Sequence, residues 1–265
     1  MAFGGEIILR PRSWRRLLRF GGYATVAALS PSSYGAAARA IAVRQIYLTA
    51  WKVLPGYLAF SALLSVVIIE IVRNSDIVRS AASYTGDTHV NTALELVLRV
   101  LVLELIPLLT ALFVALRSGA AIGAEVALMR VQGELEDHHQ RGASPLHAEL
   151  VPRIAAAALS VFSLTALSVA LAMYLAYTSF FGGSNFGLDL FTRVVGQVFD
   201  PQILVGLLLK CLLFGLAVAL IPLATGLEAE RGKMGTVPVA VLAGLMKLFL
   251  VIGVIEVLSL MIKYV

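Results

Sequence analysis

Residues 201–225 read PQILVGLLLKCLLFGLAVALIPLAT, and Lys210 is the only charged side chain in this run. A helix of roughly 20 apolar residues crosses the hydrocarbon core of a bilayer, which is about 30 Å thick. Four further runs are long and apolar enough to do the same; they cover residues 53–72, 92–116, 154–181 and 239–262. Continuously apolar runs favour helices, because the strands of a membrane barrel alternate apolar and polar residues. The chain is therefore predicted to be an all-α polytopic membrane protein with five transmembrane helices.

The composition of the whole chain agrees with this fold class. Of its 265 residues, 59% are hydrophobic and 14% are charged, and the mean hydropathy is +0.90. Ordinary soluble domains are only about 45–50% apolar. The single cysteine, Cys211, lies within the 201–225 run and can form no disulfide inside the chain.

The positive charges lie mostly in alternate connecting segments. Fourteen Lys and Arg residues fall in the segments 1–52, 117–153 and 226–238. Four fall in the segments 73–91, 182–200 and 263–265. Cytoplasmic loops carry the excess of Lys and Arg, so we expect a cytoplasmic N-terminus and an external C-terminus. The net charge of +5 thus reflects membrane topology rather than nucleic-acid binding.

Residues 1–52 are predicted to form a cytoplasmic and interfacial region, and residues 53–265 the transmembrane domain. The motif SWRRLLRF superficially resembles a secretion signal, but no uninterrupted apolar stretch follows it. Around Trp14, apolar and arginine side chains can occupy opposite faces of a helix. We expect this helix to lie on the cytoplasmic leaflet, with a disordered basic tail as the alternative.

Motifs of catalysis and of nucleotide binding are absent from the sequence. It contains no P-loop, no His-Glu-x-x-His, no Gly-x-Ser-x-Gly and no paired-cysteine metal signature. The chain is therefore predicted not to be an enzyme, and any ATP would be bound by another subunit. His138 and His139 point about 100° apart on a helix and predict a solvated loop rather than a metal site.

The longest polar interruption, residues 123–153, reads GAEVALMRVQGELEDHHQRGASPLHAELVPR. Residues 124–139 can form a cytoplasmic amphipathic helix between the second and third spans, with Leu128, Val131 and Leu135 on one face. Such a helix offers a surface to a soluble partner. The alternative is that it lies flat on lipid, which its acidic side chains disfavour because the inner leaflet is itself anionic.

Several motifs between residues 104 and 153 follow a recognisable order. They read ELIP (104–107), RSG (117–119), AEVALM (124–129), GASP (142–145) and VPR (151–153). This series resembles the E-L-G-P, R-x-G, A-E-I-x-x-M, M-G-I-D-P and V-P-R series of the MlaE-type permeases of MCE-associated lipid ABC transporters. Farther on, LLLKCLLFG around Lys210 and GLEAE at 226–230 are also similar, so the resemblance covers roughly residues 40–262.

The chain departs from the family pattern at four points, one of which is the absence of the family's A-T-T-like run from GKMGTVPVA before the last span. Ile106 stands where the family has the glycine of E-L-G-P, and Ser144 where it has the aspartate before Pro145. The family's E-Q-I-D-A-L-E segment corresponds to GELEDHH at 133–139, which keeps acidic residues but loses apolar ones. These differences leave the fold in place and point to a docking surface specialised for its own ATPase.

The resemblance implies a function and a set of partners. The chain would be the non-catalytic permease subunit of an ATP-driven phospholipid transporter in the bacterial inner membrane. Its partners would be a cytoplasmic ABC ATPase that binds ATP and Mg, a periplasmic MCE-domain protein, a small STAS-like regulatory protein and a second permease copy. That copy would make a homodimer, with a heterodimer as the alternative. An ion-coupled secondary transporter or a non-transporting scaffold are the alternative functions.

Two groups of residues are predicted to carry this function. Glu104, with Lys210 or Arg99, would line a polar patch for the lipid headgroup, because all three lie at similar depth and charges inside spans rarely face lipid. An ion pair that only fixes helix packing is the alternative. Tyr84 resembles a tyrosine of the family's lipid cavity. The ATPase-docking residues would be Glu125, Leu128, Met129, Val131, Glu134, Leu135 and Glu136.

Overall fold

The structure is a computed structural model that describes residues 43, 47, 51, 53–76, 80, 89–134, 150–182 and 187–264. The described residues contain no strand, and five of their helical stretches are long and apolar enough to cross a membrane. The predicted fold class and number of spans are thereby confirmed. The expected interfacial helix around Trp14 lies outside the described residues, as does Tyr84.

Four of the five spans are single helices, and the second is composed of several helical parts. The first is α4 (Leu54–Arg73), the third is α10 (Val151–Phe181), the fourth is α12 (Pro201–Gly226) and the fifth is α13 (Thr236–Tyr264). A short helix, α11 (Leu188–Val198), precedes α12. The second span is one helical stretch with five parts: α6 (His89–Leu96), η3 (Val97–Leu105), α7 (Ile106–Val114), η4 (Ala115–Gly119) and α8 (Ala120–Gln132).

The cytoplasmic helix predicted for residues 124–139 differs from the observed one. The second span continues without a break through α8, and this stretch is 44 residues long, so part of it extends beyond the length that a bilayer needs. It ends at Gln132 because Gly133 adopts a left-handed conformation, with φ of 83°. Glycine is the residue that most readily ends a helix in this way. The prediction treated Gly133 as an interior helix residue, and this was wrong.

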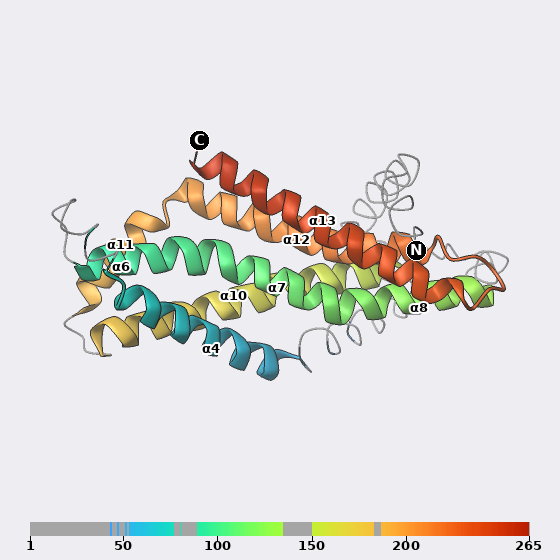
Figure 1. Ribbon diagram of the computed structural model, residues 1–265, viewed down its shortest axis with the longest axis horizontal. Coiled ribbons are helices and arrows are strands. Elements are labelled where there is room, and N and C mark those ends of the chain that lie inside the picture. Colours follow the sequence, from blue (N-terminus) through green and yellow to red (C-terminus); the bar gives the residue numbers. More distant parts are fainter. Residues whose placement is uncertain are drawn as a thin grey trace.

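The long second span runs through the length of the bundle (Figure 1). The helices α12 and α13 form an antiparallel pair along one side of it, and α4 packs against α10. Apolar side chains from all five spans meet in the middle, where Tyr57 donates or accepts a 2.6 Å hydrogen bond with Thr110. At the end that carries α6 and α11, a second apolar cluster joins these helices to α4 and α10.

Small residues bring α8 close to α12. A Cβ atom added to Gly226 would lie 2.8 Å from the carbonyl oxygen of Gly123, and one added to Gly123 would lie 3.3 Å from the carbonyl oxygen of Pro222. Membrane helices associate through such close backbone contacts, because apolar side chains gain little by leaving lipid tails. The glycines therefore place α8 against α12 and leave many large apolar side chains of α12 and α13 exposed at the surface of the bundle.

Candidate functional site

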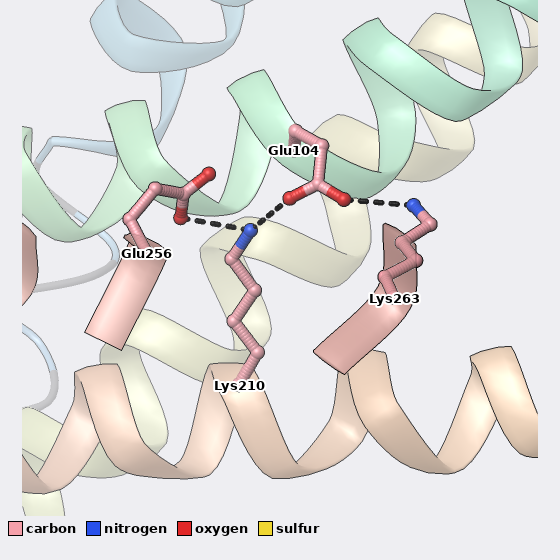
Figure 2. Close-up of polar contacts among 4 residues, drawn as sticks. All are labelled: Glu104, Lys210, Glu256 and Lys263. Carbon is pink, nitrogen blue, oxygen red and sulfur yellow. Dashed lines mark hydrogen bonds and ion pairs between the residues drawn. The ribbon is translucent and has the colours of Figure 1, made fainter. Parts of the chain in front are cut away.

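Four charged side chains from three helices meet inside the bundle (Figure 2). Lys210 of α12 forms ion pairs with Glu104 of η3 and with Glu256 of α13, the latter at 2.8 Å between Nζ and Oε2. Lys263 of α13 donates from Nζ to Oε1 of Glu104 over 2.7 Å. Negative and positive charges thus alternate in this series of contacts, which runs Glu256, Lys210, Glu104, Lys263. We call these four residues the charge network.

The helix around Glu104 is wider than an α-helix. Residues Val97–Leu105 are π-helical, and the amide of Ile106 donates to the carbonyl of Leu101, five residues earlier. Pro107 lacks the N–H that a regular α-helix would direct at the carbonyl of Leu103, which favours an irregularity here. Glu104 therefore lies within a π-helical segment. Such segments occur frequently at functional sites.

The charge network is buried but compensated. The side chain of Lys210 is 3% exposed, and those of Glu104 and Glu256 are 11% and 13% exposed. A charged residue at the centre of a span costs about 2.5–3.5 kcal/mol on insertion scales. Two carboxylates and two ammonium groups balance one another, and the Lys210 ammonium also lies 5.8 Å from the centre of the Phe214 ring. The network can therefore exist in an apolar bundle. Its ammonium groups could also bind another anion in place of one carboxylate.

The structure brings together two of the predicted substrate residues, Glu104 and Lys210. Arg99 instead pairs with Glu95, one helical turn earlier, at 2.8 Å, and both side chains are partly exposed. Sequence reasoning missed Glu256 and Lys263. They lie seven residues apart in an apolar run, which is two helical turns and therefore one face of α13, and this spacing was a usable signal.

The predicted docking residues have diverse surroundings. The side chain of Leu128 is 39% exposed, and Glu134 is exposed as well. Val131 is 5% exposed and packs with Ala229 of the same chain, so this chain itself covers its side chain. Glu125 pairs with Arg153 at the start of α10, at 2.7 Å. Met129 is half-buried. Leu135 and Glu136, like His138 and His139, lie outside the described residues.

Within this chain, α8 buries a face that differs from the one predicted to contact the ATPase. Only Val131 belongs to both. The buried residues of this helix are Ile122, Gly123, Val126, Ala127 and Val131. Gly123 and Ala127 allow the close contact with α12, and Ile122 and Val126 pack beside them in an apolar cluster with α10 and α12.

Comparison with known proteins agrees with this architecture. The family model described as Permease MlaE matches residues 42–262. The chain belongs to the MlaE permease family. This MlaE-family chain is 28% identical to a probable ABC transporter permease of Synechocystis over 71% of its own length and 72% of the relative's. It is 27% identical to a probable ABC transporter permease of Rickettsia prowazekii over 61% of its own length and 63% of the relative's.

A more distant relative comes from a plant. The chloroplast protein TRIGALACTOSYLDIACYLGLYCEROL 1 of Arabidopsis thaliana is 25% identical over half of this chain and 38% of its own length. Taken together, family and fold establish a multi-pass membrane permease of the ABC transporter type. An ABC permease works with an ATPase, so an ATPase partner follows from the family.

Proposed function

We propose that this MlaE-family permease moves phospholipid between the bacterial inner membrane and a periplasmic MCE protein. The observation that carries the proposal is the charge network, buried in a largely apolar bundle. A lipid headgroup that enters such a bundle needs a polar binding site. Two ammonium groups that share one carboxylate are suited to binding a phosphate. The name of the Arabidopsis relative, which is that of a glycerolipid, agrees with a lipid substrate.

In this proposal the headgroup phosphate pauses at Lys210 and Lys263. Both ammonium groups contact Glu104 in the structure, so its carboxylate holds the place that the phosphate would take. Arg99 and Tyr84 remain proposed contacts to lipid. Arg99 would contact lipid away from the charge network, because in the described residues it pairs with Glu95.

The proposed assembly contains two permease copies, each contributing one bundle, and a cytoplasmic ATPase that binds ATP and Mg. Hydrolysis takes place in that ATPase, and this chain has no catalytic role. The MCE protein binds on the periplasmic side, and a small STAS-like protein binds the ATPase. The distribution of Lys and Arg supports a cytoplasmic N-terminus and a periplasmic C-terminus.

The ATPase is proposed to bind the exposed end of α8. Leu128 is the exposed large apolar side chain of this helix, and Glu125 and Glu134 are exposed acidic groups near it. Burial of Leu128 would give affinity, and the carboxylates would orient the ATPase. Met129, Leu135 and Glu136 are proposed to extend this surface.

One experiment tests both halves of the proposal. The tagged permease is purified with its ATPase and reconstituted in proteoliposomes that contain fluorescent phospholipid. We expect the ATPase to co-purify, and we expect ATP to drive extraction of the phospholipid to added MCE protein. Leu128→Asp should release the ATPase while the permease still inserts, because a carboxylate cannot enter an apolar groove without loss of affinity.

The controls separate the alternatives. Val131→Asp places a charge in this chain's own core, so it should lower the stability of the permease rather than affect docking alone. Undiminished pull-down of the ATPase by the Leu128→Asp permease would contradict docking at α8 and favour lipid contact. Lipid movement that needs a proton gradient but no ATP would instead support an ion-coupled transporter, in which Glu104 and Lys210 relay protons.

A further inference from the structure

A second buried lysine lies far from the charge network. Lys247 of α13 is 1% exposed, and its Nζ lies 3.4 Å from Oε2 of Glu228, which is 34% exposed. Glu228 belongs to the segment 227–235 that connects α12 to α13. The lysine side chain thus extends from inside the bundle toward the end where α8 finishes.

The segment that carries Glu228 is attached to α8. Ala229 is buried with Ala127 and Val131 of α8. The amide of Gly232 donates to the carbonyl of Val131 over 3.1 Å. The close contact between Gly226 of α12 and Gly123 and Ala127 of α8 adjoins this attachment on the same face of α8. A displacement of α8 would therefore move Glu228 with it.

The other end of the ion pair lies on a long continuous helix. The α13 helix runs from Thr236 to Tyr264, and its only proline, Pro238, lies in the first turn. Lys263 follows Lys247 by 16 residues, which is about 24 Å at 1.5 Å per residue. Glu256 lies between them. A shift at Lys247 would thus be carried along α13 to both of its residues in the charge network.

We propose that the Glu228–Lys247 ion pair is a positioning contact that transmits movement of α8 to Glu256 and Lys263. Movement of α8 by the ATPase would pull α13 through this pair and change the distance between the two lysines and Glu104. This inference rests on the proposed function only in taking α8 as the ATPase contact. It goes beyond that function by naming one polar contact that, beside the direct packing of α8 on α13, joins the ATPase side to the charge network.

The test measures movement directly, independently of lipid. The permease for this test carries Cys211→Ala, Leu96→Cys and Met261→Cys and is bound to its ATPase. Spin labels are attached to the two new cysteines, one near the outer end of the second span and one in α13. Both positions are exposed, at 39% and 56%. ATP should change the distance between these labels in the otherwise unaltered complex. Lys247→Met should abolish most of that change while the ATPase remains bound.

Two further variants make the test specific. Glu228→Gln alters a partly exposed side chain with little change of shape, so it tests the same contact even where Lys247→Met lowers the yield of folded protein. Lys247→Arg keeps the positive charge and should retain the movement. The matched control is the Glu230→Gln, Lys233→Met double variant, which removes an exposed ion pair from the same segment and should behave like the unaltered chain.

The outcomes are distinguishable. Lys247→Met and Glu228→Gln should each also lower the amount of lipid moved per ATP hydrolysed by about tenfold. This lies within the roughly 5–150-fold range of coupling between sites. An ATP-dependent distance change that persists at full size in Lys247→Met and Glu228→Gln overturns the inference, as does the absence of any change in the unaltered complex. A normal distance change without phospholipid transfer would overturn the proposed substrate and leave the inference standing.

Discussion

At the scale of single residues, the charge network limits which substitutions are informative. Replacing Lys210 alone leaves Glu256 without the ion pair that it has in the structure, and a buried charge without its partner is strongly destabilising. Exchanging Glu104 and Lys210 would place a lysine at position 104 within reach of Lys263, which now binds Glu104 at 2.7 Å. Loss of transport in such variants would therefore not separate headgroup binding from helix packing.

Neutralising all four groups together avoids this problem. The variant Glu104→Leu, Lys210→Met, Glu256→Leu, Lys263→Met leaves no member of the network charged. Replacing buried ion pairs by apolar side chains of similar volume is often neutral or stabilising by roughly 1–4 kcal/mol. We expect the variant to fold and to bind the ATPase, whereas phospholipid transfer should fall by at least about tenfold because the phosphate loses both ammonium groups.

The comparison variant is Glu70→Gln with Arg73→Met, which removes a partly exposed ion pair from α4. It should transfer lipid at close to the unaltered rate, because the structure places this pair outside the charge network. Normal transfer by the fully neutralised variant would show that the four charges serve only helix packing. Transfer and thermal stability are measured on the same proteoliposome preparations.

At the scale of helices, glycine sets how α8 and α12 meet. A Cβ atom at Gly226 would lie 2.8 Å from the Gly123 carbonyl oxygen and 3.2 Å from the Ala127 amide nitrogen. Backbone atoms of a helix cannot give way as a flexible side chain can. The contact is thus specific for glycine, and the position of α8, with its proposed docking surface, depends on it.

The Gly226→Ala substitution tests this contact. It should destabilise the permease by about 1–3 kcal/mol, as overpacking of a tightly packed interior does. The matched control is Gly206→Ala in the same helix, where nothing lies within 4 Å of the added Cβ. Alanine there should be neutral or stabilising by up to about 1 kcal/mol, because it favours the helix more than glycine does. Thermal unfolding in detergent compares the two, and equal midpoints would refute close packing at Gly226.

At the scale of the whole molecule, the five spans place the two ends of the bundle on opposite sides of the membrane. One end holds α8 and the segment 227–235, with Lys233 exposed, and the other holds α11, with Gln197 exposed. The excess of Lys and Arg in the segments 117–153 and 226–238 predicts that the α8 end is cytoplasmic.

Cysteine labelling tests this orientation. In a Cys211→Ala chain, a membrane-impermeant maleimide added to intact spheroplasts should label Gln197→Cys and leave Lys233→Cys unlabelled. Both positions should react after the membrane is permeabilised, which controls for the reactivity of each cysteine. Labelling of Lys233→Cys before permeabilisation would reverse the proposed topology, and the ATPase could then not be placed at α8.

The sequence by itself determined the fold class, the number of spans and the family. The predicted fourth span, 201–225, ends one residue before the observed α12, Pro201–Gly226, and the first span is equally close. These properties are local, because a hydrocarbon core of fixed thickness selects helices by length and hydropathy alone. The sequence also indicated that Glu104 would meet Lys210 or Arg99, which lie at similar depth, and the structure pairs it with Lys210.

Only the tertiary structure decided which faces meet and which charges complete the network. Hydropathy did not indicate which face of α8 packs within the bundle, where close approach to Pro222 and Gly226 requires small residues at positions 123 and 127. Likewise, Glu256 and Lys263 join the network only because α13 folds back along α12 and sets them beside Lys210 and Glu104. In a bilayer, an apolar helix face gains little free energy by leaving lipid for another helix. Helix contacts therefore depend on shape and on charge pairing, which involve residues far apart in the chain.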